Sequence, residues 1–257
     1  FLPLGLALRL TRFPRPRRLS PLPVLAFASS LVMTGLQFAF FERPLPMGDP
    51  AAYLEMGGKF ADAIARLGSP LGLGPILSDI QPYLAIAGIM TIAVLLSLAG
   101  SQGGVRAGGI PVFALCAVIA FGMQWLVFIP SYIRQTEHYF DITGSLTYIT
   151  LAVTAVVAVG NWEPRSLILS GLIFLWSARL GSFLFQRVRR SGGDARFDAL
   201  KRHFPSFLMT WTLQGLWVLL TSAAALAAIT TTAPEPLEWI AWLGVATWVA
   251  GFAVEAI

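Results

Sequence analysis

The sequence predicts an all-α fold, a polytopic membrane bundle of about six or seven helices. Of the 257 residues, 56% are hydrophobic and only 12% are charged, whereas soluble globular domains carry about 25% charged residues. The mean hydropathy is +0.72. Several apolar runs approach the ~20 residues that a helix needs to cross a bilayer, and none alternates with the period of a strand. These observations together exclude a soluble domain.

The N-terminal part divides into a basic tail, 1–21, and the start of a single transmembrane domain, 22–257. The tail contains arginines among prolines and precedes the first acid of the chain, Glu42. Leu22–Phe41 is apolar and long enough to span. A mixed polar connection follows over 42–79, in which Ala61–Leu67 is a candidate interfacial helix.

Six further apolar segments predict the remaining helices: Ile80–Ala99, Ile110–Ile129, Leu146–Gly160, Ser166–Val188, Phe207–Ile229 and Leu237–Ile257. Leu146–Gly160 is short and rich in β-branched residues, so we expect it to span only partly. The chain begins at Phe1, and its last apolar run barely reaches spanning length. We therefore expect a fragment whose C-terminal end is truncated.

The charge balance points to a membrane surface. Lys and Arg number 18 and Asp and Glu 13, a net charge of +5. In so apolar a chain, basic loops at a membrane face account for this excess better than nucleic acid does. Membrane lipids are thus expected partners and nucleic acid is not. The 187–206 loop is strongly basic and is predicted to be cytoplasmic. With Cys116 as the single cysteine and two histidines, no metal site is predicted.

The stretch from Trp176 to Arg202 is the strongest candidate for a binding site. Arg179 lies inside an apolar segment, where a charge costs at least ~2.5 kcal/mol and is treated as functional by default. Arg187 is eight residues further on and falls on the same side of a helix. Clustered arginines bind phosphate well, so we expect an anionic ligand. The alternative is that these arginines anchor the helix at the membrane surface.

A second polar stretch, Ser131–Ser145, contains Glu137, Tyr139 and Asp141, whose side chains can donate or relay a proton. If the preceding helix continues through it, Gln135 and Tyr139 share one face. The alternative is an ordinary polar loop.

Two polar residues lie in the last apolar segments. Gln214 can form a hydrogen bond to a neighbouring helix. The carboxylate of Glu255 needs a partner in the membrane, for which Arg179 is a candidate.

Four runs carry a resemblance to a known family: FIPSYIRQTEHYFDITGSLTY, WSARLGSFLFQRVRRSGGDARFD, WTLQGLW and GFAVEAI. They are similar to an uncharacterised bacterial membrane family grouped with the steroid 5-alpha-reductases, over about residues 125–257. The resemblance implies a multi-helix reductase that uses NADPH to saturate a carbon–carbon double bond conjugated to a carbonyl. The implied substrate is a lipid or steroid-like molecule, and the implied location is the bacterial inner membrane.

The resemblance also implies roles for individual residues. It places four residues around the NADPH phosphates and ribose: Arg179, Arg187, Asp194 and Arg196. It places Gln214 and Glu255 nearby. As candidates for polarising the carbonyl oxygen and supplying the proton, it gives Glu137, Tyr139 and Asp141. The chain ends before the family's usual C-terminal His-Pro-Asn-Tyr stretch, a main part of its cofactor site.

Two other functions fit the same sequence. A membrane methyltransferase that uses S-adenosylmethionine shares a similar design, but a sulfonium favours aromatic residues and carboxylates over several arginines. A transporter or non-enzymatic lipid-binding protein would also suit an apolar bundle with a basic loop. Transporters are often built from inverted repeats, and no repeat is visible here.

Overall fold

The computed structural model describes residues 74–160, 162–191, 193–194, 197–234 and 236–256. The basic tail, the first predicted span and the candidate interfacial helix lie outside these residues. The described part is almost entirely helical, which confirms the predicted all-α fold.

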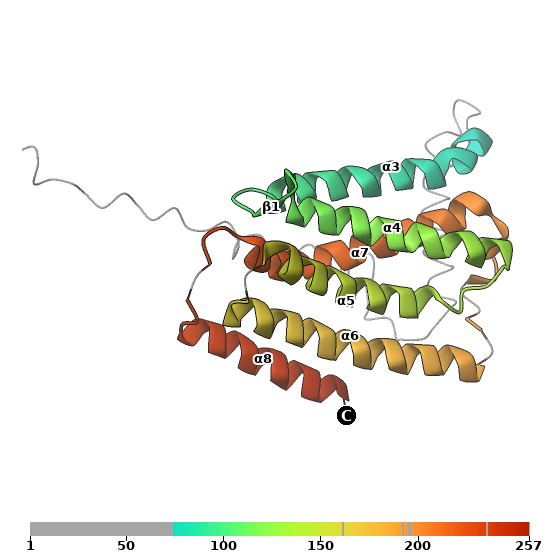
Figure 1. The fold of residues 1–257 in the computed structure, drawn as a ribbon. Coiled ribbons are helices and arrows are strands. Elements are labelled where there is room, and N and C mark those ends of the chain that lie inside the picture. Colours follow the sequence, from blue (N-terminus) through green and yellow to red (C-terminus); the bar gives the residue numbers. More distant parts are fainter. Residues whose placement is uncertain (1–73, 161, 192, 195–196, 235, 257) are drawn as a thin grey trace, which may run out of the picture.

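The described chain contains six α-helices and a minute hairpin (Figure 1). The helices are α3 (Gly74–Gly100), α4 (Val112–Ile133), α5 (Phe140–Val159), α6 (Pro164–Ser191), α7 (Phe204–Thr230) and α8 (Trp239–Ala256). Strands β1 (Arg106–Ala107) and β2 (Ile110–Pro111) form the hairpin between α3 and α4. A short 3-10 turn, η4 (Leu200–Arg202), precedes α7.

Residues with special backbone conformations lie at the ends of three helices. Helix α4 ends where Gln135 adopts a positive φ of 51°, and the Gln135 side chain donates to the Tyr132 carbonyl at 2.8 Å. Helix α5 ends at Gly160, whose left-handed conformation lets its N–H bond the Val156 carbonyl, a common way of closing a helix. Pro205 lies in the first turn of α7, where its missing N–H costs nothing.

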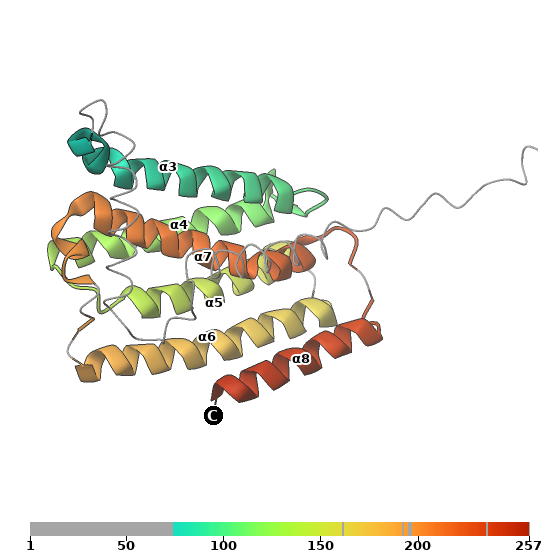
Figure 2. The same cartoon turned by 180° about the vertical axis from the view of Figure 1, so that it is seen from behind.

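Helix α7 is the centre of the bundle and packs against α3, α4, α5 and α6 (Figures 1 and 2). In the apolar stretches of α4, α5 and α7, between 44% and 50% of the residues are buried inside the protein, whereas in α3 and α6 only 11% are. The core therefore lies between the three inner helices, and includes Phe113, Leu151 and Leu219. Helix α8 runs beside α6 in both views.

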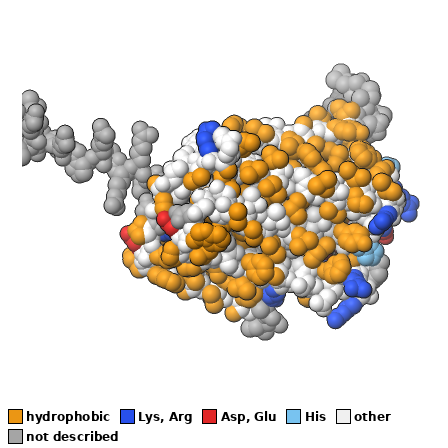
Figure 3. All heavy atoms as spheres, viewed as in Figure 1, with side chains coloured by type: hydrophobic (Ala, Val, Ile, Leu, Met, Phe, Trp, Pro, Cys, Tyr) orange, Lys and Arg blue, Asp and Glu red, His pale blue; other side chains and the backbone are white. Residues whose placement is uncertain are grey.

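Five helices, α3 to α7, are long and apolar enough to cross a membrane, which supports an integral membrane protein. Figure 3 shows a surface dominated by hydrophobic side chains, as expected for a lipid-facing protein. Lys and Arg gather mostly at the end where α4 and α6 finish and α5 and α7 begin, at the right of that view. We call this the basic end.

Three expectations about these segments were wrong. The segment expected to span partly, Leu146–Gly160, is the larger part of a full helix that begins at Phe140. The hypothesis that α4 continues through Tyr139 fails, because the chain turns at Gln135. The predicted 187–206 loop is shorter than expected, because α6 continues to Ser191 and carries Arg187 on its last turns.

Candidate functional site

Two connections meet at the basic end. One joins α4 to α5 over Arg134–Tyr139, and the other joins α6 to α7 over 192–203. Among the residues that the sequence singled out, they contain Glu137, Tyr139 and Asp194. They are far apart in the chain, and the antiparallel order of the helices brings them to the same end of the bundle (Figure 1).

Glu137 joins the two connections directly. Its side chain is buried, with 3% exposed. One carboxylate oxygen, Oε1, accepts the backbone N–H of Asp194 at 2.9 Å. The other, Oε2, accepts Lys201 Nζ at 3.1 Å. A buried carboxylate needs such partners, because an unpaired charge in this position is strongly destabilising.

Lys201 links this carboxylate to a second one. Its Nζ lies 2.8 Å from Asp198 Oδ1, on the same short turn. The hydrogen bond that Lys201 donates to Asp198 is the largest cause that raises the pKa of Lys201 above its usual 10.5, and the hydrogen bond to Glu137 and the charge of Glu137 add to it. Lys201 therefore stays protonated at neutral pH. The stability that this shift contributes is present below pH 10.5 and is lost only as the pH rises through the elevated pKa.

An aromatic cluster lies beneath the second connection. It consists of Phe128, Phe140, Phe197, Phe207 and Trp211, from four separate segments. The Phe197 ring contacts those of Phe140 and Phe207, with centroids at 4.9 and 6.3 Å. The cluster thus holds the middle of the 193–201 segment against the helices.

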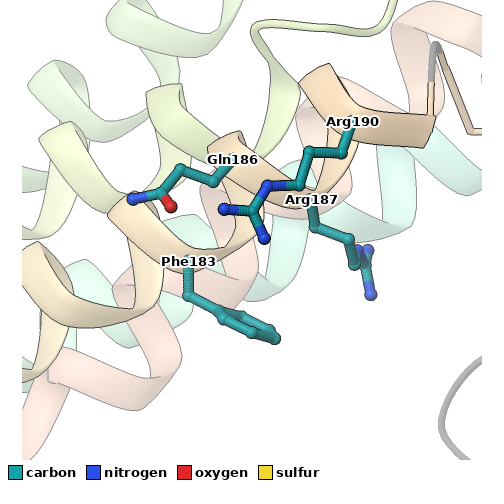
Figure 4. Close-up of a pocket in the computed structure, with 4 residues that line it drawn as sticks. All are labelled: Phe183, Gln186, Arg187 and Arg190. Carbon is teal, nitrogen blue, oxygen red and sulfur yellow. The ribbon is translucent and has the colours of Figure 1, made fainter.

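A pocket of about 360 Å³ opens on the last two turns of α6 (Figure 4). It is lined by Phe183, Gln186, Arg187 and Arg190, at the i, i+3, i+4 and i+7 positions that share a helix face. In Figure 4 the Arg190 guanidinium folds back along the helix toward Gln186. We call this the arginine pocket, and its chemistry suits an anion.

Arg179 lies on the same helix as the arginine pocket but does not line it. Its guanidinium lies over the ring of Phe252 from α8, at 5.4 Å from the centroid. Such cation–π contacts contribute ~0.5–2 kcal/mol and here connect α6 to α8. Glu255 lies on α8 in the turn after Phe252, and its side chain is outside the described part. Arg196 is also outside the described residues.

The other predicted residues are placed as follows. Tyr139 is the N-cap residue of α5, and 44% of its side chain is exposed. Asp141 is in the first turn of α5, where the helix dipole favours a negative charge. Gln214 donates from Nε2 to the Phe140 carbonyl at 3.1 Å. A Cβ at Gly144 would lie 2.6 Å from that same Nε2, so glycine there leaves room for the amide.

The structure therefore brings Glu137 and Asp194 together and places Gln214 beneath the first connection. It places Arg179 and Arg187 in different surroundings, because Arg179 packs against α8 and Arg187 lines the arginine pocket. Sequence reasoning missed Lys201, whose link to Glu137 spans 64 positions and leaves no local signal. It also left Gln186 and Arg190 out of the expected cofactor site, although they follow Phe183 and Arg187 at helical spacing. Among the described residues, no group of three or more His, Cys, Asp or Glu could hold a metal ion.

Comparison with known proteins identifies a family. The family described as "Protein of unknown function (DUF1295)" matches residues 127–257, about half of the chain. This segment runs from the last turns of α4 to α8 and includes both connections and the arginine pocket. No curated protein matches the chain. No solved structure matches it. The chain thus belongs to the DUF1295 family of proteins of unknown function.

Proposed function

We propose that this protein is a membrane-embedded reductase that uses NADPH to reduce a carbon–carbon double bond conjugated to a carbonyl in a lipid or steroid-like substrate. The observation that carries the proposal is the arginine pocket, with two arginines on one face at the polar end of a lipid-facing helix. The association of this family with steroid 5-alpha-reductase-like proteins supports it.

The residues of the arginine pocket fit the phosphate-bearing part of NADPH. A volume of about 360 Å³ is at the small end of ligand pockets, which span roughly 300–1,000 Å³. It suits a phosphate-bearing end of the dinucleotide. Arg187 and Arg190 would hold phosphate groups, since guanidinium binds them with two parallel hydrogen bonds. The adjoining 193–201 segment carries Asp194, for which we propose a ribose contact.

The proposed chemistry divides between cofactor and protein. Bound NADPH would supply the hydride. Tyr139 is the residue of choice for the proton, because its exposed phenol lies on the connection that contacts the Asp194 backbone through Glu137. The apolar faces of the helices would admit a substrate from the bilayer and keep water away from the double bond.

The distribution of Lys and Arg supports an orientation in which the basic end faces the cytoplasm. NADPH would be available on that side. The described Lys and Arg residues at that end are Arg134, Arg187, Arg189, Arg190, Lys201 and Arg202, and those at the opposite end are Arg106 and Arg165. Positive residues favour the cytoplasmic side. We propose that the 192–203 connection lies in the cytoplasm, and the family resemblance favours a bacterial inner membrane as the location.

The first prediction concerns cofactor affinity. In detergent-solubilised protein, Arg187→Ala and Arg190→Ala should each weaken NADPH binding by about tenfold or more, the usual effect of losing a charged hydrogen bond. Any preference for NADPH over NADH should shrink in at least one of them. The matched control is Arg189→Ala, because Arg189 lies over the Phe185 ring and does not line the pocket. Binding is measured by fluorescence of the reduced nicotinamide.

Two results would contradict the proposal. The parent protein could bind S-adenosylmethionine and not NADPH, which would favour the methyltransferase. Equal losses in Arg189→Ala and Arg187→Ala would mean that only the overall charge of the basic end matters, as for an anchor at a lipid surface.

The second prediction separates chemistry from binding. Tyr139→Phe should lower single-turnover oxidation of NADPH by about 100-fold or more, the typical contribution of a general acid. NADPH affinity should change less than about twofold, because the lost interaction is made mainly in the transition state. The control is Tyr132→Phe, because the Tyr132 ring stacks on Phe128 and meets Phe204 edge-to-face. If Tyr139→Phe turns over normally, another group supplies the proton.

A further inference from the structure

The contacts of the Glu137 carboxylate differ from those that a proton donor to the substrate would need. Its two oxygens accept the Asp194 N–H at 2.9 Å and the Lys201 ammonium at 3.1 Å. A proton donor must carry its proton and reach the substrate. Here both oxygens already accept hydrogen bonds from the second connection, and the side chain is only 3% exposed.

We propose that Glu137 is a positioning residue, the centre of a clasp that fixes the 193–201 segment to the α4–α5 connection. The clasp consists of Glu137, Gly193, the Asp194 N–H and Lys201. The inference rests on the proposed function in one respect, since it assumes that this segment contributes to cofactor binding.

Gly193 shows how closely the segment approaches the carboxylate. Its φ of 156° is at the edge of the range that favours glycine, and a Cβ there would lie 3.0 Å from Glu137 Oε1. That separation is tighter than most Cβ contacts. A side chain at this position would push the carboxylate away from the Asp194 N–H. Gly193 therefore serves the close approach to Glu137.

Glu137 forms hydrogen bonds with the segment near both of its ends. Asp194 is bonded near its start and Lys201 near its end, while Phe197 is buried between them in the aromatic cluster, with 7% exposed. Lys201 also contacts Asp198, but that carboxylate is 61% exposed, and exposed pairs contribute little. The buried Glu137 is the partner that decides where Lys201 lies. The described residues of the segment, 193–194 and 197–201, are thus held above the helices at both ends.

The test uses three variants of the full chain without cofactor. Glu137→Gln keeps an oxygen that can accept the Asp194 N–H but removes the charge. Lys201→Met removes the cation and keeps the carboxylate. Arg202→Met is the control, because it removes one charge from an exposed neighbour outside the clasp. Opening of the segment is followed by hydrogen exchange over 193–201 and by chymotrypsin cleavage after the buried Phe197.

We expect exchange and cleavage to rise about tenfold in Glu137→Gln and in Lys201→Met, as for the loss of one charged hydrogen bond. Arg202→Met should match the parent. The double variant Glu137→Gln with Lys201→Met should open little more than either single one, because both remove the same contact. NADPH binding should weaken in both single variants.

Two outcomes overturn the inference. In the first, Glu137→Gln stops turnover but leaves exchange and cleavage as in the parent, which would make Glu137 the proton donor. In the second, neither single variant opens the segment more than Arg202→Met does. If the variants open the segment but the parent binds no NADPH, the clasp stands and the proposed function fails.

Discussion

Replacing Gly181 with alanine is expected to destabilise the protein by about 1–3 kcal/mol, the usual cost of overpacking, and to displace α6. A Cβ at Gly181 would lie 2.6 Å from both Cβ and Oγ of Ser145 on α5. The Ser145 Cβ is attached to the backbone and cannot move aside, so the helices must separate. Thermal unfolding in detergent measures the change.

Two variants complete this test. Gly171→Ala on the same helix is the control, because nothing lies within 4 Å of a Cβ at that position, and it should be neutral or slightly stabilising. Ser145→Gly combined with Gly181→Ala should recover most of the lost stability, since the clash is removed. If the pair is no more stable than Gly181→Ala alone, close contact between α5 and α6 is not the cause.

Truncation of Trp211 should have the largest effect on stability, about 3–5 kcal/mol, as for a large aromatic residue in a core. Trp211 is fully buried, and its ring meets those of Phe140 and Phe207 at 5.2 and 6.0 Å. Losing it leaves a cavity in the aromatic cluster that supports Phe197. Chymotrypsin cleavage after Phe197 should therefore also increase.

The control for Trp211→Ala is Trp217→Ala on the same helix. Half of the Trp217 side chain is exposed on the lipid-facing side, where alanine leaves no cavity. Trp217→Ala should cost much less stability and should not affect cleavage after Phe197. Equal losses in the two variants would show that tryptophan content matters and that the aromatic cluster does not.

Most of the fold was predictable because long apolar runs have few alternatives in a membrane. The start of α5 was not, since hydropathy counts Asp141, Thr143 and Ser145 as polar and so moves the predicted start to Leu146. The Thr143 hydroxyl donates to the Tyr139 carbonyl one turn earlier, at 2.6 Å. Once satisfied in this way, Thr143 is buried in the bundle.

The candidate site was predictable only in part. Spacing along one helix indicated that Arg187 belongs to a basic face near the end of α6, because the helical period is fixed. The partners of Glu137 and Arg179 come from other segments, Lys201 and Phe252. Such pairs depend on how the helices pack, which periodicity does not reveal. The buried role of Glu137 was therefore invisible, and the sequence suggested a proton donor.

The family match begins at residue 127, within α4, and this position has a consequence for the unit of folding. The first half of α4 supplies Phe113, Cys116 and Phe121 to the same core as Leu219 and Leu226 of α7. A fragment cut at residue 127 would sever α4 and leave these leucines without their neighbours. The segment that the family model matches is therefore shorter than the part of this chain that shares one core, which extends upstream at least to the start of α4.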